Sequence, residues 1–181
     1  MKSFAFTVIL VSLISFNISG QEKTNSIVPV DETSGKIEYQ EVVHVEGSKE
    51  DLFNRCISWV NNFYVNPVAV TQVRDLKSGV VEGRHQLRIH YMEEGYEKDA
   101  GLVMYNFKIE FKEGRYRYTI TDFVLKKATR YPAENWMDKT DPLYNPQWDE
   151  YLRQIDAYAK DLIADLKEKM QPEPEKEEDD W

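Results

Sequence analysis

The chain has 181 residues and a formal net charge of −9 at pH 7, with 41% hydrophobic and 13% aromatic residues. A chain of this length and apolar content is expected to fold as one domain around its own core. Nucleic-acid binding depends on clustered positive charge that neutralises phosphates. The acidic balance therefore argues against a nucleic-acid partner, and we expect none.

The first twenty residues are typical of an export signal. Lys2 is followed by an almost unbroken apolar run over residues 4–16 and then by the small pair Ser19-Gly20. This run is shorter than the roughly 20 apolar residues that a membrane-spanning helix needs. Residues 1–20 are therefore predicted to be a cleaved signal peptide, and the alternative is an uncleaved N-terminal anchor.

The cysteine count narrows the expected compartment. Cys56 is the only cysteine, so no N-terminal cysteine is available for lipid attachment and no intramolecular disulfide can form. We expect an exported protein, periplasmic or extracellular, that is not a lipoprotein and has no transmembrane span after signal cleavage. Cys56 falls on the apolar face of a predicted helix, which favours a buried structural thiol over a reactive one.

Composition divides the remainder of the chain into three parts. Residues 21–35 form a polar lead, and residues 36–170 carry the alternating and helical patterns of a single α+β domain. Residues 171–181 hold a run of acidic side chains with one lysine. This tail is predicted to be disordered, because it is too charged to pack.

The domain is expected to open with a strand and a capped helix. Residues from Lys36 to Glu46 have high β-propensity, and Gly47 ends the strand. Ser48 then stands three residues before Asp51, the spacing of a helix N-cap with an acid in the first turn. Apolar residues recur at helical spacing as far as residue 63, which predicts a helix with one face in the core.

Four further strands and a long helix are predicted in the rest of the domain. Alternation and turn residues place the strands at Val68–Arg74, Val80–Tyr91, Leu102–Phe111 and Tyr116–Leu125. Residues 92–100 are predicted to be a charged loop, and the inward positions of the last two strands are Val103, Tyr105, Phe107, Ile109, Phe111, Tyr116, Tyr118, Ile120 and Val124. Helical spacing predicts the final helix over Gln147–Met170.

The element order defines the fold class. Alternating strands bury one face of a sheet and leave the other wet, so helices are expected on one face only. We predict an α+β fold: a twisted antiparallel sheet with a helix after the first strand and a long C-terminal helix packed on the same face.

Several of these segments resemble a known family. Gly35-Lys-Ile37, Val42-Val-His-Val45, the Ser48 helix start, Trp59 and the strand Arg115–Phe123 resemble the secreted domain of unknown function 4468 over roughly residues 28–125. The resemblance implies a TATA-binding-protein-like fold and an exported protein of a Bacteroidota-like organism. It implies no activity and no site residues, and fold analogy alone does not define function.

Catalytic and metal chemistry find little support in the sequence. His85 and His90 are five residues apart on one predicted strand, so they point to opposite faces and cannot share a metal. We expect no metal site, no cofactor and no catalytic residues. Asp122 stands on the apolar parity of its strand, where it is either a buried carboxylate of functional interest or a cap on a backbone group.

Two surfaces are candidates for binding. A basic stripe is expected on the wet sheet face, formed by Arg84, Arg88, Lys108, Arg115 and Arg117. It suits an anionic partner, and the alternative is a solvated face laced with salt bridges. The second surface is an aromatic linker whose candidate residues are Tyr131, Trp136 and Tyr144. These rings either form a docking platform or cover the open end of the core.

The leading hypothesis is a non-enzymatic binding or interaction module of the cell envelope. Its expected partner is a protein, a glycan or another anionic ligand of the envelope. The alternative is a ligand carrier or hydrolase with a pocket between the sheet and the C-terminal helix.

Overall fold

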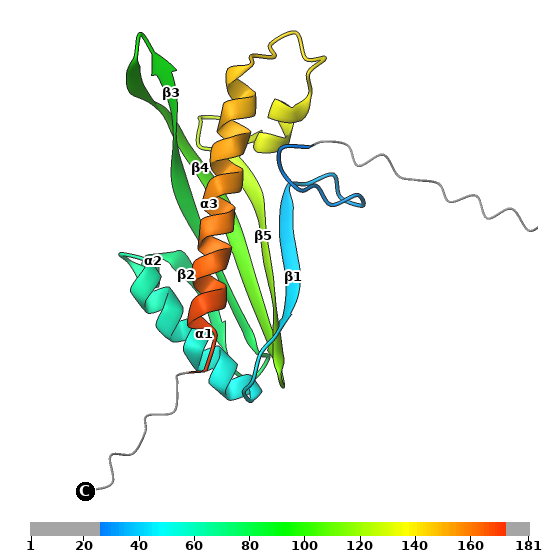
Figure 1. The fold of residues 1–181 in the computed structure, drawn as a ribbon, viewed down its shortest axis with the longest axis vertical. Coiled ribbons are helices and arrows are strands. Elements are labelled where there is room, and N and C mark those ends of the chain that lie inside the picture. Colours follow the sequence, from blue (N-terminus) through cyan, green and yellow to red (C-terminus); the bar gives the residue numbers. More distant parts are fainter. Residues whose placement is uncertain (1–25, 173–181) are drawn as a thin grey trace, which may run out of the picture.

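The computed structural model describes residues 26–172, so the predicted signal peptide and residues 173–181 of the predicted acidic tail lie outside the described residues (Figure 1). The described part folds as one antiparallel sheet with helices. The strands are β1 (Glu38–His44), β2 (Thr71–Asp75), β3 (Val80–Glu93), β4 (Tyr96–Lys112), β5 (Arg115–Leu125) and β6 (Tyr131–Pro132). The helices are α1 (Lys49–Phe63), α2 (Pro67–Val70), the 3-10 helix η1 (Ala133–Met137) and α3 (Gln147–Lys169).

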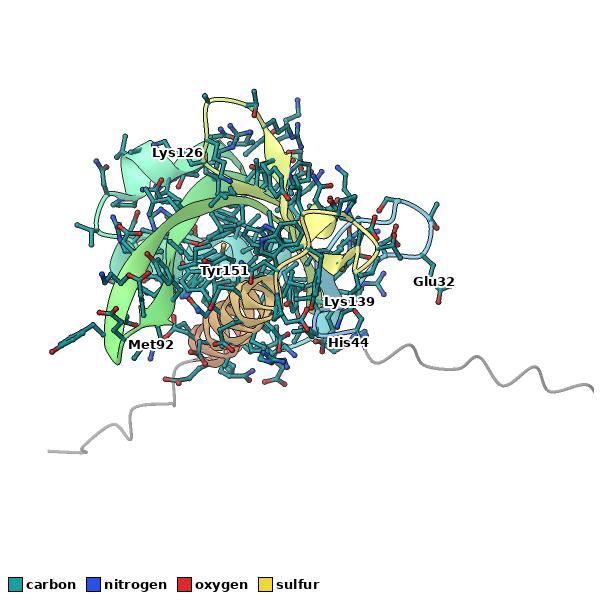
Figure 2. The ribbon with its side chains drawn as sticks, turned by 90° about the horizontal axis from the view of Figure 1, so that it is seen from above. Glu32, His44, Met92, Lys126, Lys139 and Tyr151 are labelled. Atoms are coloured by element: carbon teal, nitrogen blue, oxygen red, sulfur yellow. The ribbon has the colours of Figure 1, made fainter. Side chains whose placement is uncertain are left out.

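The sheet has the order β1-β5-β4-β3-β2, and the short β6 pairs with β5. α1 and α3 pack on one face, and the sheet curves around α3 when it is viewed from above (Figures 1 and 2). The opposite side of the sheet is called the outer face below. This arrangement confirms the predicted α+β class and the placement of both long helices. None of the helices within residues 26–172 has the length and apolar content that crossing a membrane requires.

A capping box starts α1 where the sequence predicts it. The Ser48 hydroxyl accepts the Asp51 backbone N–H at 3.1 Å, and the Asp51 carboxylate accepts the Ser48 backbone N–H at 2.9 Å. The apolar face of the helix is buried, including Cys56, whose side chain is fully enclosed. Burial raises the pKa of the Cys56 thiol, which keeps it protonated and structural.

The segment before β2 differs from the prediction. Residues predicted to extend from Val68 as a strand instead form the short helix α2, and β2 begins only at Thr71. Asn66 is the N-cap, since its side-chain oxygen accepts the Ala69 N–H at 3.2 Å, and Pro67 has the fixed φ that suits a first helical position. The strand is therefore shorter than predicted, and this shortening opens the edge of β3.

Residues 92–100 were predicted to be a charged loop, but most of them belong to strands. β3 and β4 continue as a long hairpin that turns at Glu94-Gly95, where both residues have positive φ values of 53° and 84°. This hairpin projects past the helices, with Met92 at its outer end (Figures 1 and 2). Because the hairpin end has little cover on either face, its strands carry charged residues without the apolar alternation that marks a half-buried strand.

The alternation of buried and exposed side chains along β5 shifts by one residue at Asp122. This residue has a φ of 58°, the register with β4 shifts next to it, and the buried side chains after it are Phe123 and Leu125. Val124, predicted to face inward, is therefore only partly buried. Asp122 lies on the outer face, where Lys36 is 2.7 Å from its carboxylate and holds its pKa below the ordinary value.

Candidate functional site

The five predicted basic side chains lie on β3, β4 and β5, and their alternation places them on the outer face. Three of them are neutralised by neighbouring carboxylates. Lys108 lies 3.1 Å from Glu82, Arg117 donates to Glu110 at 2.8 Å, and Arg88 pairs with Asp99. Much of the predicted basic stripe is therefore an ion-pair network, as the alternative interpretation expected.

Arg84 and Arg115 differ from the other three. Within the described residues neither guanidinium is paired with a carboxylate, and Arg84 makes one side-chain hydrogen bond, at 2.9 Å to the Asn106 amide oxygen. Both arginines are exposed. Arg84 has further donors available for an anionic group, since a guanidinium carries five N–H bonds.

The aromatic linker is mostly core. Trp136 is only 2% exposed, and its ring packs 5.3 Å from Tyr151 in α3 and 6.3 Å from Tyr131. Tyr144 is half-buried, and its ring centroid lies 5.9 Å from that of Trp148 in an edge-to-face arrangement. Trp136 is therefore not an exposed docking residue, because it closes the core between the sheet and α3. Tyr131 and Tyr144 keep part of their surface free.

A cavity of about 580 Å³ lies where the sheet edge is interrupted. β2 pairs with β3 only as far as Gly83, and α2 and the loop before it form the wall at the end of β2. The next stretch of β3, from Arg84 to Gln86, lines the cavity directly. We call this hollow the edge cavity, and its other lining side chains include Phe63, Tyr64, Ala69, Gln72, Met104 and Tyr158.

Tyr64, Tyr158 and His85 form the polar floor of the edge cavity, and the fully buried Tyr105 connects the two tyrosines. The hydroxyl of Tyr105 lies 3.3 Å from that of Tyr64 and 2.9 Å from that of Tyr158, which links strand β4 to both sides of the cavity. The His85 ring lies 4.9 Å from the Tyr64 ring. Burial raises the pKa of all three tyrosines and lowers the pKa of His85, so the floor is uncharged at neutral pH.

The lining of the edge cavity supplies aromatic surface together with neutral hydroxyl and imidazole groups. Tyrosine hydroxyls whose pKa is raised are poor bases at neutral pH, and a half-buried neutral imidazole has no carboxylate partner to orient it in the described part of the chain. Within residues 26–172 no group of three or more His, Cys, Asp or Glu side chains could hold a metal ion. Aromatic walls with a few polar groups are typical of ligand pockets.

Of the residues that line the edge cavity, the sequence singled out Arg84 as a candidate of the basic stripe, and His85 was considered only to exclude a metal site shared with His90. The tyrosines carried a signal that could have been used. Tyr105 stands at a predicted inward position, where its hydroxyl needs a partner. The interruption of the sheet edge carried no signal, because it depends on where β2 ends against β3.

The fold defines the class of protein first: an α+β protein with a TBP-like fold. Residues 39–126 match the family model DUF4468, described as a domain of unknown function with a TBP-like fold. Through this stretch the chain matches the DUF4468 family, and the resemblance of its motifs is confirmed.

Solved structures agree with this assignment at the level of the fold. A TBP-like protein from Parabacteroides distasonis has a TM-score of 0.66 at 17% identity, covering 82% of this chain and 100% of that one. A DUF4468 family protein from Bacteroides ovatus has a TM-score of 0.62 at 16% identity, covering 84% of this chain and 95% of that one. No curated protein matches the chain.

Proposed function

We propose that this protein is an exported, non-enzymatic binding module of the bacterial cell envelope, and that its ligand binds in the edge cavity. The observation that carries the proposal is the position of the cavity: an aromatic hollow opens directly on an interrupted sheet edge, beside an arginine that has no carboxylate partner within residues 26–172. The partner is a protein, glycan or other anionic ligand of the envelope and not a nucleic acid, given the net charge of −9.

The lining of the cavity supports an amphipathic ligand with an anionic group. Phe63, Tyr64 and Tyr158 supply ring surface, and Arg84 supplies a cation at the outer rim. Val65 and Val68 on the loop and on α2 are strongly exposed at 105% and 83%. Exposed apolar side chains beside a hollow are typical of a binding surface.

Export and compartment form the second half of the proposal. They rest on the sequence of residues 1–20, with their single lysine and apolar run. Expression of the full chain in a Bacteroidota host, followed by cell fractionation and mass spectrometry, is expected to give a soluble periplasmic or extracellular protein that begins near residue 21. Recovery of an intact N-terminus in the membrane fraction would instead support the uncleaved anchor.

Ligand binding can be tested with methyl-labelled methionine and the anionic dye anilinonaphthalene sulfonate. Met104 lines the edge cavity, whereas Met92 is 64% exposed at the hairpin end and serves as an internal control. Titration with the dye is expected to shift the Met104 methyl resonance and to leave Met92 unchanged.

Two matched arginine variants complete the test. Arg84→Ala is expected to weaken dye binding about five- to tenfold, since a charge-assisted hydrogen bond is lost. Arg117→Ala removes the same charge from the outer face at a residue paired with Glu110, and it is expected to leave the affinity unchanged. Equal shifts at Met92 and Met104, or equal effects of the two variants, would contradict the proposal.

A further inference from the structure

The interrupted edge of β3 has a defined beginning and end. β2 covers β3 from Val80 to Gly83, and at His90 the side chain of Gln154 takes over the role of a neighbouring strand. Its amide oxygen accepts the His90 N–H at 2.9 Å, and its amide nitrogen donates to the His90 carbonyl at 2.8 Å. Among the described residues no strand pairs with β3 between these two covers, and the first part of this stretch, from Arg84 to Gln86, lines the edge cavity.

Backbone N–H and C=O groups in this stretch of β3 have no neighbouring strand to pair with in the described part of the chain. In an antiparallel sheet, residues two apart direct their N–H and C=O groups to the same side. The groups of His90 point away from β4, so those of Arg88 and Gln86 do as well. Within residues 26–172 neither Gln86 nor Arg88 has a hydrogen-bond partner on this side. The edge therefore offers two N–H and two C=O groups in strand geometry.

We propose that the partner is a protein segment that binds as an extended strand against the edge of β3 between Gly83 and His90. This inference rests on the proposed function and specifies the ligand that the edge cavity receives. A small molecule can fill the aromatic hollow, but only an extended backbone matches the repeat of the free N–H and C=O groups. The open stretch spans about 20 Å at 3.4 Å per residue, the length of a strand of about six residues.

The two faces of the added strand meet different surroundings, which defines the class of peptide. Side chains on the helix side enter the edge cavity beside Tyr158, Tyr64 and His85, so aromatic or large apolar residues suit those positions. Side chains on the outer face lie beside Arg84, which has no carboxylate partner among the described residues, so an acidic residue suits that position. The expected segment alternates acidic and aromatic residues.

The peptide Ac-Glu-Phe-Glu-Phe-Glu-NH₂ is a direct probe. Residues directly opposite each other in a sheet share a face, and Gln86 and Arg88 have outer-face side chains. The glutamates of the bound probe must therefore direct their N–H groups to β3, and the phenylalanines must direct theirs to solvent. N-methylation of the central glutamate is expected to weaken binding about fivefold or more, since a main-chain hydrogen bond is lost and a methyl group blocks the edge. N-methylation of either phenylalanine is expected to change the affinity less than about twofold.

A matched pair of protein variants tests the same contact from the other side. Gln86→Pro removes the free N–H, a change that an unpaired edge position tolerates, whereas Gln86→Ala removes only the side chain. Gln86→Pro is expected to lower probe affinity about fivefold or more relative to Gln86→Ala. The N-methyl comparison with the unaltered protein decides the question if Gln86→Pro does not fold.

The outcomes separate this inference from the proposed function. Dye binding at Met104 without probe binding, or with equal binding of both N-methyl isomers, overturns the strand-addition proposal and leaves the edge cavity as a small-molecule site. Loss of both dye and probe binding overturns the proposed function as well. If the protein dimerises and Gln86→Pro abolishes the dimer, the edge of β3 binds a second copy of the chain. That result would also overturn the proposal.

Discussion

Gln154 in α3 satisfies both backbone groups of His90 in β3, with distances of 2.9 Å to the N–H and 2.8 Å to the carbonyl. One side chain thus acts as a neighbouring strand for one residue. The contact holds α3 against β3 at His90, which is where the open edge of β3 ends. A helix that covers a sheet edge is one means by which proteins limit unwanted strand pairing.

The substitution Gln154→Glu tests this contact by pH. Glutamate still accepts the His90 N–H, but its carboxylate cannot donate to the carbonyl, so the folded state should raise the pKa of the new carboxyl. A raised pKa means that the variant is least impaired below about pH 4, where the carboxyl is protonated, and loses stability as pH rises through the folded-state pKa. At pH 7 we expect a loss of about 1–3 kcal/mol in urea unfolding.

Gln154→Leu is the control for that pH dependence. It lacks both the donor and the acceptor, so its deficit relative to the unaltered protein should be the same at pH 4 and pH 7. If the deficit of Gln154→Glu also stayed constant between these pH values, the donated bond to the His90 carbonyl would contribute nothing to stability.

Asp122 combines an ion pair with a backbone conformation that few residues adopt. Its pKa is lowered by Lys36, so the stabilisation is present above the ordinary pKa of 3.8 and is lost as pH falls through the folded-state value. Asp122→Asn tolerates the φ of 58° and is expected to cost about 0.5–1 kcal/mol at pH 7 and almost nothing near pH 3. Chemical denaturation across this pH range measures the difference.

Asp122→Val separates the backbone effect from the charge. A β-branched residue at this positive φ adds about 1–2 kcal/mol of strain at every pH. A valine variant as stable as the asparagine variant would show that the shift in β5 does not depend on the left-handed conformation of residue 122.

The limits of sequence-based prediction are visible in β5 and at the sheet edge. Alternation correctly placed Tyr116 and Ile120 in the core, because burial on one face imposes a period of two. It failed at Val124, since one residue in the left-handed region reverses the parity after it, and aspartate in a strand is only a weak sign of such a bulge. The open edge of β3 could not be predicted, because it depends on the end of β2 and on Gln154, a helical residue that lies 64 positions from His90 in the sequence.

The aromatic linker gives a prediction about stability. Trp136→Ala is expected to cost about 3–5 kcal/mol in urea unfolding, because a buried indole between Tyr131 and Tyr151 is removed. Tyr144→Ala, at a half-buried ring, is expected to cost less than about 1 kcal/mol. Similar values for the two variants would mean that Trp136 does not close the core. Limited proteolysis in the linker should accelerate for Trp136→Ala only.

Gly83, the last residue of β3 that β2 covers, has no room for a side chain. A Cβ there would lie 2.6 Å from Cε1 of Phe107 and 2.7 Å from the Val70 carbonyl oxygen. Gly83→Ala is therefore expected to cost about 2–3 kcal/mol and to move α2, which forms the wall of the edge cavity. The double variant Gly83→Ala/Phe107→Leu should recover part of that loss, because the aromatic ring that meets the new methyl group is gone.

The matched control is Gly114→Asn, in the turn between β4 and β5. Its φ of 67° suits asparagine, and no atom lies within 4 Å of an added Cβ, so a change of less than about 1 kcal/mol is expected. Thermal unfolding gives the stabilities, and the Met104 methyl resonance reports the cavity wall. A shift of Met104 in Gly83→Ala but not in Gly114→Asn would show that the close contact at Gly83 holds α2 in place. If Gly83→Ala is destabilised but its Met104 resonance is unchanged, the Phe107 ring moves to accommodate the new methyl group and α2 does not move.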